Sequence, residues 1–296
     1  MATIPQRTYT TLTGSGLRHD SLPMRLYHKA KKLGTWDPRD IDLAQDKRDW
    51  QSLPDESKER VRGLILSFQA GEEAVTVDLL PLIMAIAREG RLEEEMFLTT
   101  FLWEEAKHTE FFRRILDEVL QTEGDLHEIR VRNTTRELFA KDLPITMNRL
   151  LTDPSPHNQA QAAALYNMIV EGVLAETGYY SFSQVLSATG MMPGLLQGIQ
   201  LIKRDESRHI AYGVYLISRL VSQDPSLWPG VEELMQSQFA VIESSQVENE
   251  APESIRLYTR QQFEKRLGRI AKARGQSLEQ IDQAAESEEA AQTEVV

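Results

Sequence analysis

The sequence of 296 residues predicts an all-α protein, and three observations lead to this fold class. Apolar residues recur over most of the chain at the three- and four-residue spacing of amphipathic helices. No run of alternating apolar and polar residues bounded by turn residues predicts a strand. Two Glu-x-x-His pairs, Glu105 with His108 and Glu206 with His209, each interrupt an apolar helical stripe. We therefore expect a four-helix bundle with one long crossover and additional peripheral helices.

The first two core helices are expected to form a hairpin. The first begins near Ser52, where Asp55 follows three residues later with Pro54 between them. Its stripe consists of Val61, Ile65, Phe68, Glu72, Val75, Leu79 and Leu82. Gly71 and Pro81 make this helix imperfect. A second long helix after Gly90 repeats the spacing through Leu98, Phe101, Glu105, His108, Phe112, Ile115 and Val119.

The third and fourth core helices are expected to form a second hairpin. Ser155 and Pro156 open the third helix. One face of this helix carries Ala164, Met168, Glu171, Ala175, Gly178 and Phe182. Pro193 and Gly194 precede the fourth helix, which is lined by Leu195, Ile199, Ile202, Glu206, His209, Gly213, Leu216 and Leu220. The chain therefore carries one helical pattern twice.

The connections complete the predicted domain. The hairpin loops near Gly90 and at 190–194 are short, whereas the stretch 120–154 is long and serves as the crossover, with a helix around 135–150. Additional helices are expected at 38–50, 226–248 and 253–272. We expect residues 1–275 to form a single domain. The acidic segment 276–296, which has no basic residue, is expected to be a mobile tail.

The composition excludes several classes of function. The absence of cysteine excludes disulfides, thiolate catalysis and sulfur-ligated metal sites. The net charge of -12 argues against a nucleic-acid partner. A basic cluster is expected to be a solvated helix face, namely Lys265, Arg266, Arg269, Lys272 and Arg274. No apolar run approaches the roughly 20 residues that span a bilayer, and the first 20 residues lack the apolar core of an export signal. We therefore expect a cytoplasmic protein without a membrane span.

The two Glu-x-x-His pairs predict a metal site. Residues three apart share one face of a helix, and a lone glutamate precedes each pair, Glu72 by 33 residues and Glu171 by 35. Four ionised glutamates facing a bundle core would cost several kcal/mol each without cations between them. We therefore expect two metals bound by Glu72, Glu105, His108, Glu171, Glu206 and His209, the pattern of di-iron and di-manganese carboxylate bundles. Oxygen-rich ligation with one imidazole per metal suits iron or manganese.

Other polar residues near this pattern receive different interpretations. Asp205 could accept the free N–H of a ligating histidine and fix its ring. Glu73 and Glu104 lie about 100° round the helix from the adjacent ligands and are expected to be peripheral. The remaining histidines are expected to be structural or solvated, namely His19, His28, His127 and His157.

Five segments make a resemblance to a known family specific: Gly-Glu-Glu-Ala-Val-Thr at 71–76, Glu-Glu-Ala-Lys-His at 104–108, Tyr-Asn-Met-Ile-Val-Glu-Gly at 166–172, Thr-Gly-Tyr-Tyr at 177–180 and Asp-Glu-Ser-Arg-His at 205–209. From about Leu22 to Leu220 the chain resembles the R-two-like ligand-binding oxidases, relatives of the ribonucleotide reductase small subunit with a ferritin-like fold. The resemblance implies a homodimer and an electron donor that the sequence does not identify.

The resemblance also implies a chemistry. In that family a manganese-iron pair activates dioxygen, a long-chain fatty acid reaches the metals, and a tyrosine is joined by an ether bond to a valine β-carbon. It implies manganese at Glu72, Glu105 and His108, and iron at Glu171, Glu206 and His209, with di-iron as another possible filling. Val75 and Tyr166 fall on the crosslink positions, and the reaction would be a two-electron C–H oxidation. Periodicity supports Val75, one turn from Glu72, whereas Tyr166 lies about 140° from Glu171 round an ideal helix and rests on the resemblance.

Three alternatives remain open. One is a ribonucleotide reductase small subunit with a metal-based radical initiator. Phe112 stands where such subunits usually carry a radical tyrosine, and the last tyrosine is Tyr258, so the tail has none for long-range electron transfer. A ferritin-like iron storage protein is another alternative, although ferritin chains are much shorter. A purely structural role of the metals is the third.

Overall fold

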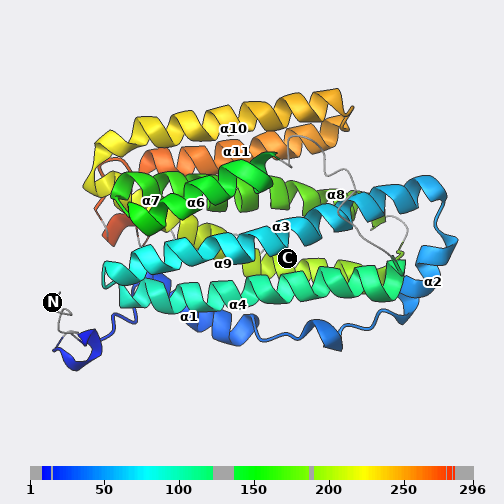
Figure 1. Cartoon of the computed structure of the whole chain (residues 1–296), viewed down its shortest axis with the longest axis horizontal. Coiled ribbons are helices and arrows are strands. Elements are labelled where there is room, and N and C mark those ends of the chain that lie inside the picture. The colour runs from blue at the N-terminus through cyan, green and yellow to red at the C-terminus, as the bar shows by residue number, and fades with distance from the viewer. Residues whose placement is uncertain are drawn as a thin grey trace.

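The computed structural model describes residues 9–14, 16–122, 137–186, 190–277, 279–281 and 283. These residues form helices and their connections, without a strand among them, which confirms the predicted all-α class. Figure 1 shows an elongated molecule whose long helices run nearly along its longest axis.

The four predicted core helices are present. The first hairpin consists of α3 (Asp55–Arg88) and α4 (Leu92–Arg114), which pack along each other. In the second half, α7 (Pro156–Ala163) runs directly into the π-helical segment η6 (Ala164–Ala175) and α8 (Glu176–Leu186), and α9 (Pro193–Gln223) follows. Pro81 lies inside α3, which continues to Arg88, and Gly90 adopts a φ of 71° in the turn that follows.

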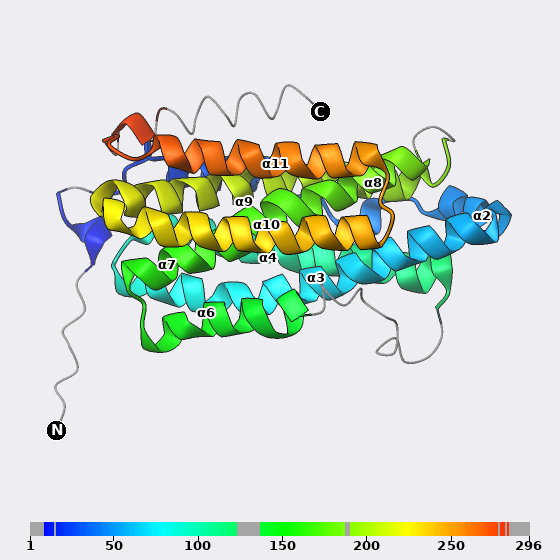
Figure 2. The ribbon, with the colours of Figure 1, turned by 90° about the horizontal axis from the view of Figure 1, so that it is seen from above.

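The crossover and the peripheral helices surround this core. The second core helix continues from α4 through η3 (Ile115–Leu120). The crossover contains η5 (Leu138–Asp142) and α6 (Leu143–Thr152), so its predicted helix is present from 137 onward, while 135–136 lie outside the described residues. The predicted helices at 226–248 and 253–272 are η7 (Pro225–Leu227) with α10 (Trp228–Glu248), and α11 (Glu253–Lys272). In Figure 2 α10 and α11 lie side by side as an outer hairpin, and both contact η6.

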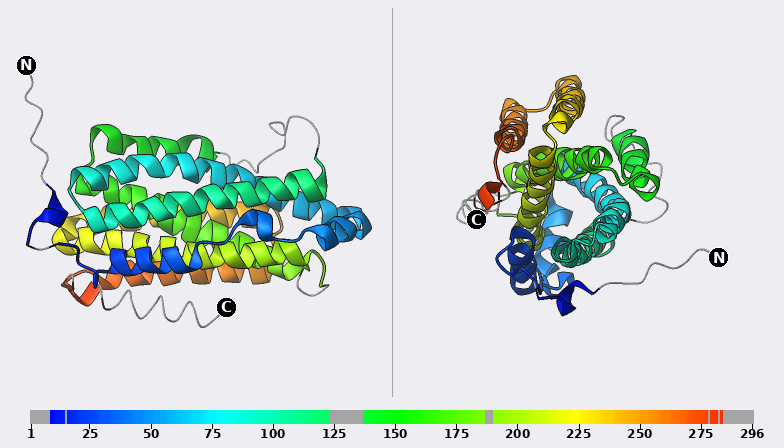
Figure 3. Two further views of the ribbon diagram at one scale, coloured as in Figure 1. Left: turned by 90° about the horizontal axis from the view of Figure 1, so that it is seen from below. Right: turned by 90° about the vertical axis from the view of Figure 1, so that its left-hand side faces the viewer.

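The amino-terminal region differs from the prediction. Besides the short η1 (Thr10–Leu12), residues Leu22–Leu33 form α1, a helix that the sequence pattern did not predict. It packs against α4 and α9 (Figure 3) and buries its apolar face, namely Leu22, Met24, Leu26 and Ala30. The predicted helix at 38–50 is divided into η2 (Pro38–Asp40) and α2 (Ala44–Ser52).

The start of α9 is fixed by a carboxylate from α2. Asp46 is fully buried and accepts hydrogen bonds from the backbone N–H groups of Gly194 at 2.9 Å and Leu195 at 2.7 Å. These N–H groups belong to the first turn of α9, where they have no partner within the helix. Asp46 therefore caps α9 from a distant part of the chain.

The apolar core consists of two clusters, and the level between them places the functional site. Along α4, the first cluster includes Phe97 and Phe101 and the second begins at Phe111. One cluster likewise gives way to the other along α9, between Ile202 and Ile210, and along α3, between Leu66 and Val75. All of the predicted metal ligands on α3, α4 and α9 lie in these intervals. The four core helices therefore enclose a polar layer between two apolar layers.

The predicted basic face on α11 is only partly solvated. Arg266 is 3% exposed, and its side chain lies against Gly172 of η6, where a Cβ would be 3.2 Å from the Arg266 Nε. Arg274 places its guanidinium 4.8 Å from the ring centre of Trp228. The solvated-face prediction was therefore wrong for Arg266, because α11 packs on η6 at a glycine that leaves room for the arginine stem.

Two further predictions concern a membrane span and the carboxyl-terminal tail. No helix in the described part of the chain is long and apolar enough to cross a membrane. Most of the predicted mobile tail, including 284–296, lies outside the described residues. Within 276–296, Ile281 is 4% exposed and belongs to the first apolar cluster.

Candidate dinuclear metal site

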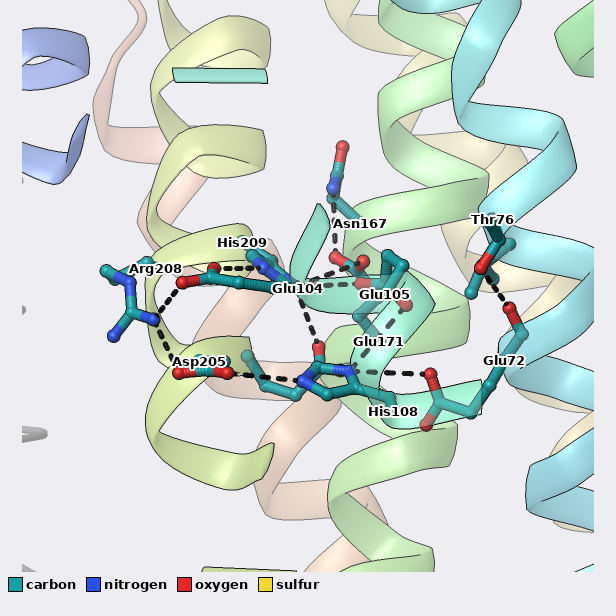
Figure 4. Close-up of polar contacts among 12 residues, drawn as sticks. Glu72, Thr76, Glu104, Glu105, His108, Asn167, Glu171, Asp205, Arg208 and His209 are labelled. Atoms are coloured by element: carbon teal, nitrogen blue, oxygen red, sulfur yellow. Dashed lines mark hydrogen bonds and ion pairs between the residues drawn. The ribbon is translucent and has the colours of Figure 1, made fainter. Parts of the chain in front are cut away.

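All six predicted ligands meet in the polar layer. Glu72 comes from α3, Glu105 and His108 from α4, Glu171 from η6, and Glu206 and His209 from α9. They form two groups whose possible ligand atoms lie within 4.8 Å of one another: Glu72, Glu105, His108 and Glu206 in the first, and Glu105, Glu171, Glu206 and His209 in the second. Every member is buried, with at most 5% exposure. Figure 4 shows ligand side chains of several helices converging.

Glu105 and Glu206 belong to both groups, which adds to the sequence prediction of three ligands for each metal. The His108 Nδ1 lies 3.4 Å from the Glu206 Oε1 and 3.8 Å from the Glu105 Oε2. The His209 Nδ1 lies 2.9 Å from the Glu105 Oε1 and 3.4 Å from the Glu206 Oε2. Each shared carboxylate thus presents one oxygen to each histidine, the arrangement needed for a bridge between two cations.

The buried ligand atoms lack hydrogen-bond partners, and this observation tests whether cations fit. Both oxygens of Glu105, one oxygen each of Glu171 and Glu206, and the Nδ1 atoms of both histidines are buried without a hydrogen bond. A buried orphaned polar atom costs about 1–3 kcal/mol, and more if it is charged. Two divalent cations would satisfy these atoms and neutralise the four glutamates. Oxygen and imidazole donors suit iron or manganese.

The outer nitrogens of the two histidines contact carboxylates in a crossed pattern. The His108 Nε2 of α4 lies 3.4 Å from the Oδ2 of Asp205 on α9. The His209 Nε2 of α9 lies 2.9 Å from the Oε2 of Glu104 on α4. Each acidic residue that precedes a predicted ligand glutamate on α4 or α9 therefore contacts the histidine of the other helix, which would fix the ring nitrogen that faces a metal.

Glu104 was predicted to be peripheral, and the structure shows that this prediction was wrong. Glu104 is fully buried, whereas Glu73 is exposed as expected. The estimate of 100° round the helix was right, but on α4 that direction points to α9 and not to solvent. A helix packed on several sides has more than one buried face.

Basic residues that the sequence analysis left aside hold the two outer carboxylates. The Arg208 guanidinium lies between them, with its Nη2 2.5 Å from the Glu104 Oε1 and 2.6 Å from the Asp205 Oδ1. The Lys107 Nζ donates to the Asp205 Oδ2 at 3.0 Å, and so does the Trp36 indole N–H at 2.8 Å. The repeated five-residue pattern acid-Glu-x-base-His at 104–108 and 205–209 contained this signal, because all four chemical types are duplicated.

The π-helical geometry of η6 explains how Tyr166 reaches the site. An ideal α-helix would place Tyr166 about 140° from Glu171. In η6 the backbone bonds follow the wider i to i+5 pattern, so residues five apart lie near the same face. Tyr166 is fully buried, and its hydroxyl donates to the backbone carbonyl oxygen of Val75 at 3.0 Å. Val75, which periodicity placed near Glu72, and Tyr166, which rested on the resemblance, are therefore neighbours.

Burial and mutual charge shift the protonation of the cluster. Burial raises the pKa of Glu72 to about 8, and burial together with the charge of Glu206 raises the pKa of Glu171 well above its usual value. Burial would also raise the pKa of Glu105, but the nearby imidazole rings of His108 and His209 lower it to about 2. Without metal the cluster therefore retains protons, and cations would bind by displacing them.

The carboxylates of the cluster favour the protonated form of both histidines when no metal is bound. Burial opposes the imidazolium form, but the surrounding carboxylates outweigh it and raise the pKa of His108 and His209 well above the usual value. The carboxylates that contribute are Asp205, Glu105, Glu206 and Glu72 for His108, and Glu104, Glu105 and Glu206 for His209. Metal ligation needs the neutral ring, so metal binding also releases protons from the histidines.

The residues that bear on the alternatives are also placed. Phe112 is fully buried and stacks on Phe68 with ring centres 5.0 Å apart. Tyr258 lies on α11, where it stacks on Tyr180 at 4.3 Å and donates to Glu176 at 3.0 Å. Of the other histidines, His19 and His28 form an exposed pair 3.3 Å apart, His157 is the second residue of α7, and His127 lies outside the described residues.

Comparison with known proteins identifies the relatives of this chain. Residues 23–265 match the family model of the ribonucleotide reductase small chain. Among similar solved structures are three variants of an R2-like ligand-binding oxidase. One, with an anaerobically reconstituted Mn/Fe cofactor, is 40% identical over 90% of this chain and 99% of that chain, with a TM-score of 0.85. Another with the same kind of cofactor is 38% identical over 90% and 98%, with a TM-score of 0.82. A third, with a non-activated Mn/Mn cofactor, is 39% identical over 90% and 99%, with a TM-score of 0.84.

Proposed function

Because the chain belongs to the ribonucleotide reductase small chain family and, within it, to the R2-like ligand-binding oxidases, we propose that it is a dinuclear-metal oxidoreductase that uses dioxygen to oxidise a C–H bond by two electrons. The observation that carries this proposal is the set of buried ligand atoms without hydrogen-bond partners, which form two groups that share Glu105 and Glu206. The Mn/Fe cofactors of the solved relatives support manganese and iron as the pair, with di-iron as the other filling.

Each position would be held by three residues of one half of the chain and by one shared glutamate of the other half. Glu72, Glu105 and His108 would bind manganese. Glu171, Glu206 and His209 would bind iron, with Glu105 and Glu206 bridging the two. The hydrogen bonds of the outer histidine nitrogens to Asp205 and Glu104 support both histidines as ligands, because they leave each Nδ1 free for a metal.

The residues around the metal pair would direct the first oxidation to Val75. When bound, a reduced manganese-iron pair would supply electrons to dioxygen and thereby allow dioxygen to act as the oxidant. Tyr166 is held as a neutral phenol, because burial raises its pKa well above the usual value. Its hydroxyl contacts the backbone of Val75, which lies one turn from Glu72 on α3. An ether bond between the Tyr166 oxygen and the Val75 Cβ would remove one hydrogen from each residue, and dioxygen would accept the two electrons and two protons.

We propose that a long-chain fatty acid is the bound ligand and that later turnovers oxidise it. Support comes from the motif resemblance and from the ligand-binding name of the solved relatives. Organic extraction of the purified protein, followed by mass spectrometry, should release a fatty acid in near-stoichiometric amount. An extract without acyl chains, from a protein that binds none when it is offered, would contradict this part.

We further propose a homodimer, a cytoplasmic location and an electron donor that is another molecule. The dimer is supported by an apolar stripe on α3, where Val77, Leu80 and Met84 are 61%, 48% and 48% exposed. Light scattering after size-exclusion chromatography should give twice the mass of one chain, and Met84→Glu should shift it toward the monomer. Cell fractionation tests the location.

The alternatives receive less support from the same residues. Phe112 cannot form a tyrosyl radical, and Tyr258 is packed on α11 against Tyr180, which does not suit a tyrosine in a carboxyl-terminal electron-transfer tail. A cage of many chains would favour iron storage, and light scattering distinguishes it from a dimer. Metal analysis combined with intact mass after aerobic loading tests the proposed function. We expect two metal ions per chain and the loss of two hydrogens, and two bound metals with an unmodified mass would contradict the oxidase assignment.

A further inference from the structure

The two metal positions differ at the lone glutamates, where the duplication of the site breaks down. The ligating histidines and bridging glutamates match in type, and each outer histidine nitrogen faces a carboxylate. Glu171 in addition accepts a hydrogen bond at 2.9 Å from the side-chain amide of Asn167, through its Oε2. Thr76 lies four residues after Glu72, and its hydroxyl donates at 2.6 Å to the backbone carbonyl of Glu72 and not to the carboxylate. Both contacts are drawn in Figure 4.

We propose that Asn167 is a positioning residue that makes the second metal position different from the first. This inference rests on the proposed function, because it concerns the same metal site. The amide occupies one oxygen of Glu171 and leaves Oε1, which has no hydrogen-bond partner and lies 3.9 Å from the His209 Nδ1. Glu171 therefore offers a metal one oxygen, whereas among the described residues no side-chain amide or hydroxyl restricts the Glu72 carboxylate in this way.

The orientation of the Asn167 amide follows from its surroundings. Asn167 is fully buried, and its Oδ1 has no hydrogen-bond partner. Turning the amide over would place that oxygen 2.9 Å from an oxygen of Glu171, so the N–H faces Glu171 whenever this carboxylate is ionised, as it would be with metal bound. Gly213 of α9 fits against the same side chain, since a Cβ at Gly213 would lie 2.2 Å from the Asn167 Cβ. Both packing and charge therefore hold the amide in place.

A difference between the positions matters for a mixed metal pair. Sites of oxygen and nitrogen ligands generally bind Fe²⁺ more tightly than Mn²⁺. Two equivalent positions would therefore both fill with iron whenever iron is present. A chain that holds one ion of each kind needs positions whose carboxylates respond differently to the two metals. Asn167 supplies such a difference directly at a ligand atom.

The test is a metal titration of the metal-free protein with Mn²⁺ alone and with Fe²⁺ alone under anaerobic conditions, followed by calorimetry. The wild type should show two binding events. Asn167→Ala and Asn167→Asp, which both remove the donor, should weaken one event about 10- to 100-fold and leave the other within about 2-fold. Thr76→Val is the matched control and should leave both events unchanged. Circular dichroism at 222 nm checks that each variant is folded.

The outcomes separate this inference from the proposed function. Two unchanged events in both folded Asn167 variants would overturn the inference while leaving the metal site intact. Equal weakening of both events would also overturn it, because a merely structural role would disturb the whole cluster. A wild type that binds no metal would remove the proposed function and this inference together. A metal-loaded sample of Asn167→Ala should also show a Mn:Fe ratio different from that of the wild type.

Discussion

The hydroxyl group of Tyr166 donates a hydrogen bond of 3.0 Å to the backbone carbonyl oxygen of Val75, and this contact joins η6 to α3 beside the metal ligands. Tyr166 is fully buried and Val75 is 5% exposed. The phenol is therefore held in one orientation next to the residue whose Cβ it would attack. The contact depends on the π-helical backbone of η6, which turns Tyr166 toward the side of Glu171.

The first prediction concerns the crosslink. After loading with manganese and iron in air, the intact mass of the wild type should fall by two hydrogens, and peptide mapping should place the change on a joined pair containing Val75 and Tyr166. Tyr166→Phe removes the attacking oxygen and should keep the full mass. Tyr179→Phe is the control, because Tyr179 is also buried and its hydroxyl lies 3.4 Å from Glu206. A loss of two hydrogens in Tyr166→Phe would show that another residue reacts.

The second prediction concerns the ligands. Glu171→Gln and His209→Ala each remove a ligand that belongs only to the second group, so each should reduce metal binding from two ions to one per chain. Elemental analysis after gel filtration measures the ratio. Glu73→Gln changes the exposed neighbour of Glu72 and should retain both ions. Normal two-metal binding in either ligand variant would mean that the ligands are assigned incorrectly.

The third prediction follows from the crossed hydrogen bonds of the histidines. Glu104→Gln should weaken metal binding at the position of His209, and Asp205→Asn should weaken it at the position of His108, each about 10- to 100-fold. Calorimetric titration of the two variants should therefore affect different binding events. The crossed assignment fails if both substitutions weaken the same event.

The fourth prediction concerns the stability of the metal-free protein against pH. The folded pKa of Glu72 is about 8, above the ordinary value of 4.5, and those of Glu171, His108 and His209 are also raised. At a pH between the ordinary pKa of each group and its raised pKa in the folded chain, the folded chain binds more protons than the unfolded chain. Its free energy of unfolding should therefore fall as the pH rises from about 5 to 8. Thermal unfolding should show a lower midpoint at pH 8 than at pH 6, and bound metal should remove most of this difference. A midpoint that rises over this range without metal would contradict the proposed protonation.

The fifth prediction concerns the cap of α9. Asp46→Ala would leave the buried N–H groups of Gly194 and Leu195 without acceptors. The free energy of unfolding should fall by about 1–3 kcal/mol, as measured by urea denaturation. Gln45→Ala, at an exposed neighbouring position, should change it little. Both variants should still bind two metal ions per chain, since Asp46 contacts the first turn of α9 and the ligands Glu206 and His209 lie further along that helix. Equal stability of Asp46→Ala and the wild type would show that the cap contributes nothing.

Much of the fold followed from periodicity. The long core helices and both outer helices of the α10 and α11 hairpin were predictable because their apolar stripes extend over many turns. Helix α1 was missed, although it buries Leu22, Leu26 and Ala30 at four-residue spacing, because it is short and polar on its other side. The π-helical backbone of η6 was not predicted, because its residues fit the spacing of an ordinary helical face in the sequence.

The candidate site was also predictable only in part. The six residues that meet in the polar layer were predictable because a buried Glu-x-x-His pair occurs twice with matched glutamates. Glu104 and Arg208 were missed because a single helix projection distinguishes one buried face from solvent, whereas α4 and α9 are enclosed on several sides. Asn167 could not be identified, because its hydrogen bond to Glu171 depends on side-chain orientation.

Metal analysis of the purified protein tests the central claim most directly, since the polar layer has a physical reason to exist only if cations fill it. The protein should be expressed with manganese and iron supplied, exchanged into metal-free buffer, and measured by mass spectrometry of its elements. We predict a total close to two transition-metal ions per chain. A total no higher than trace level in a correctly folded protein would contradict the account.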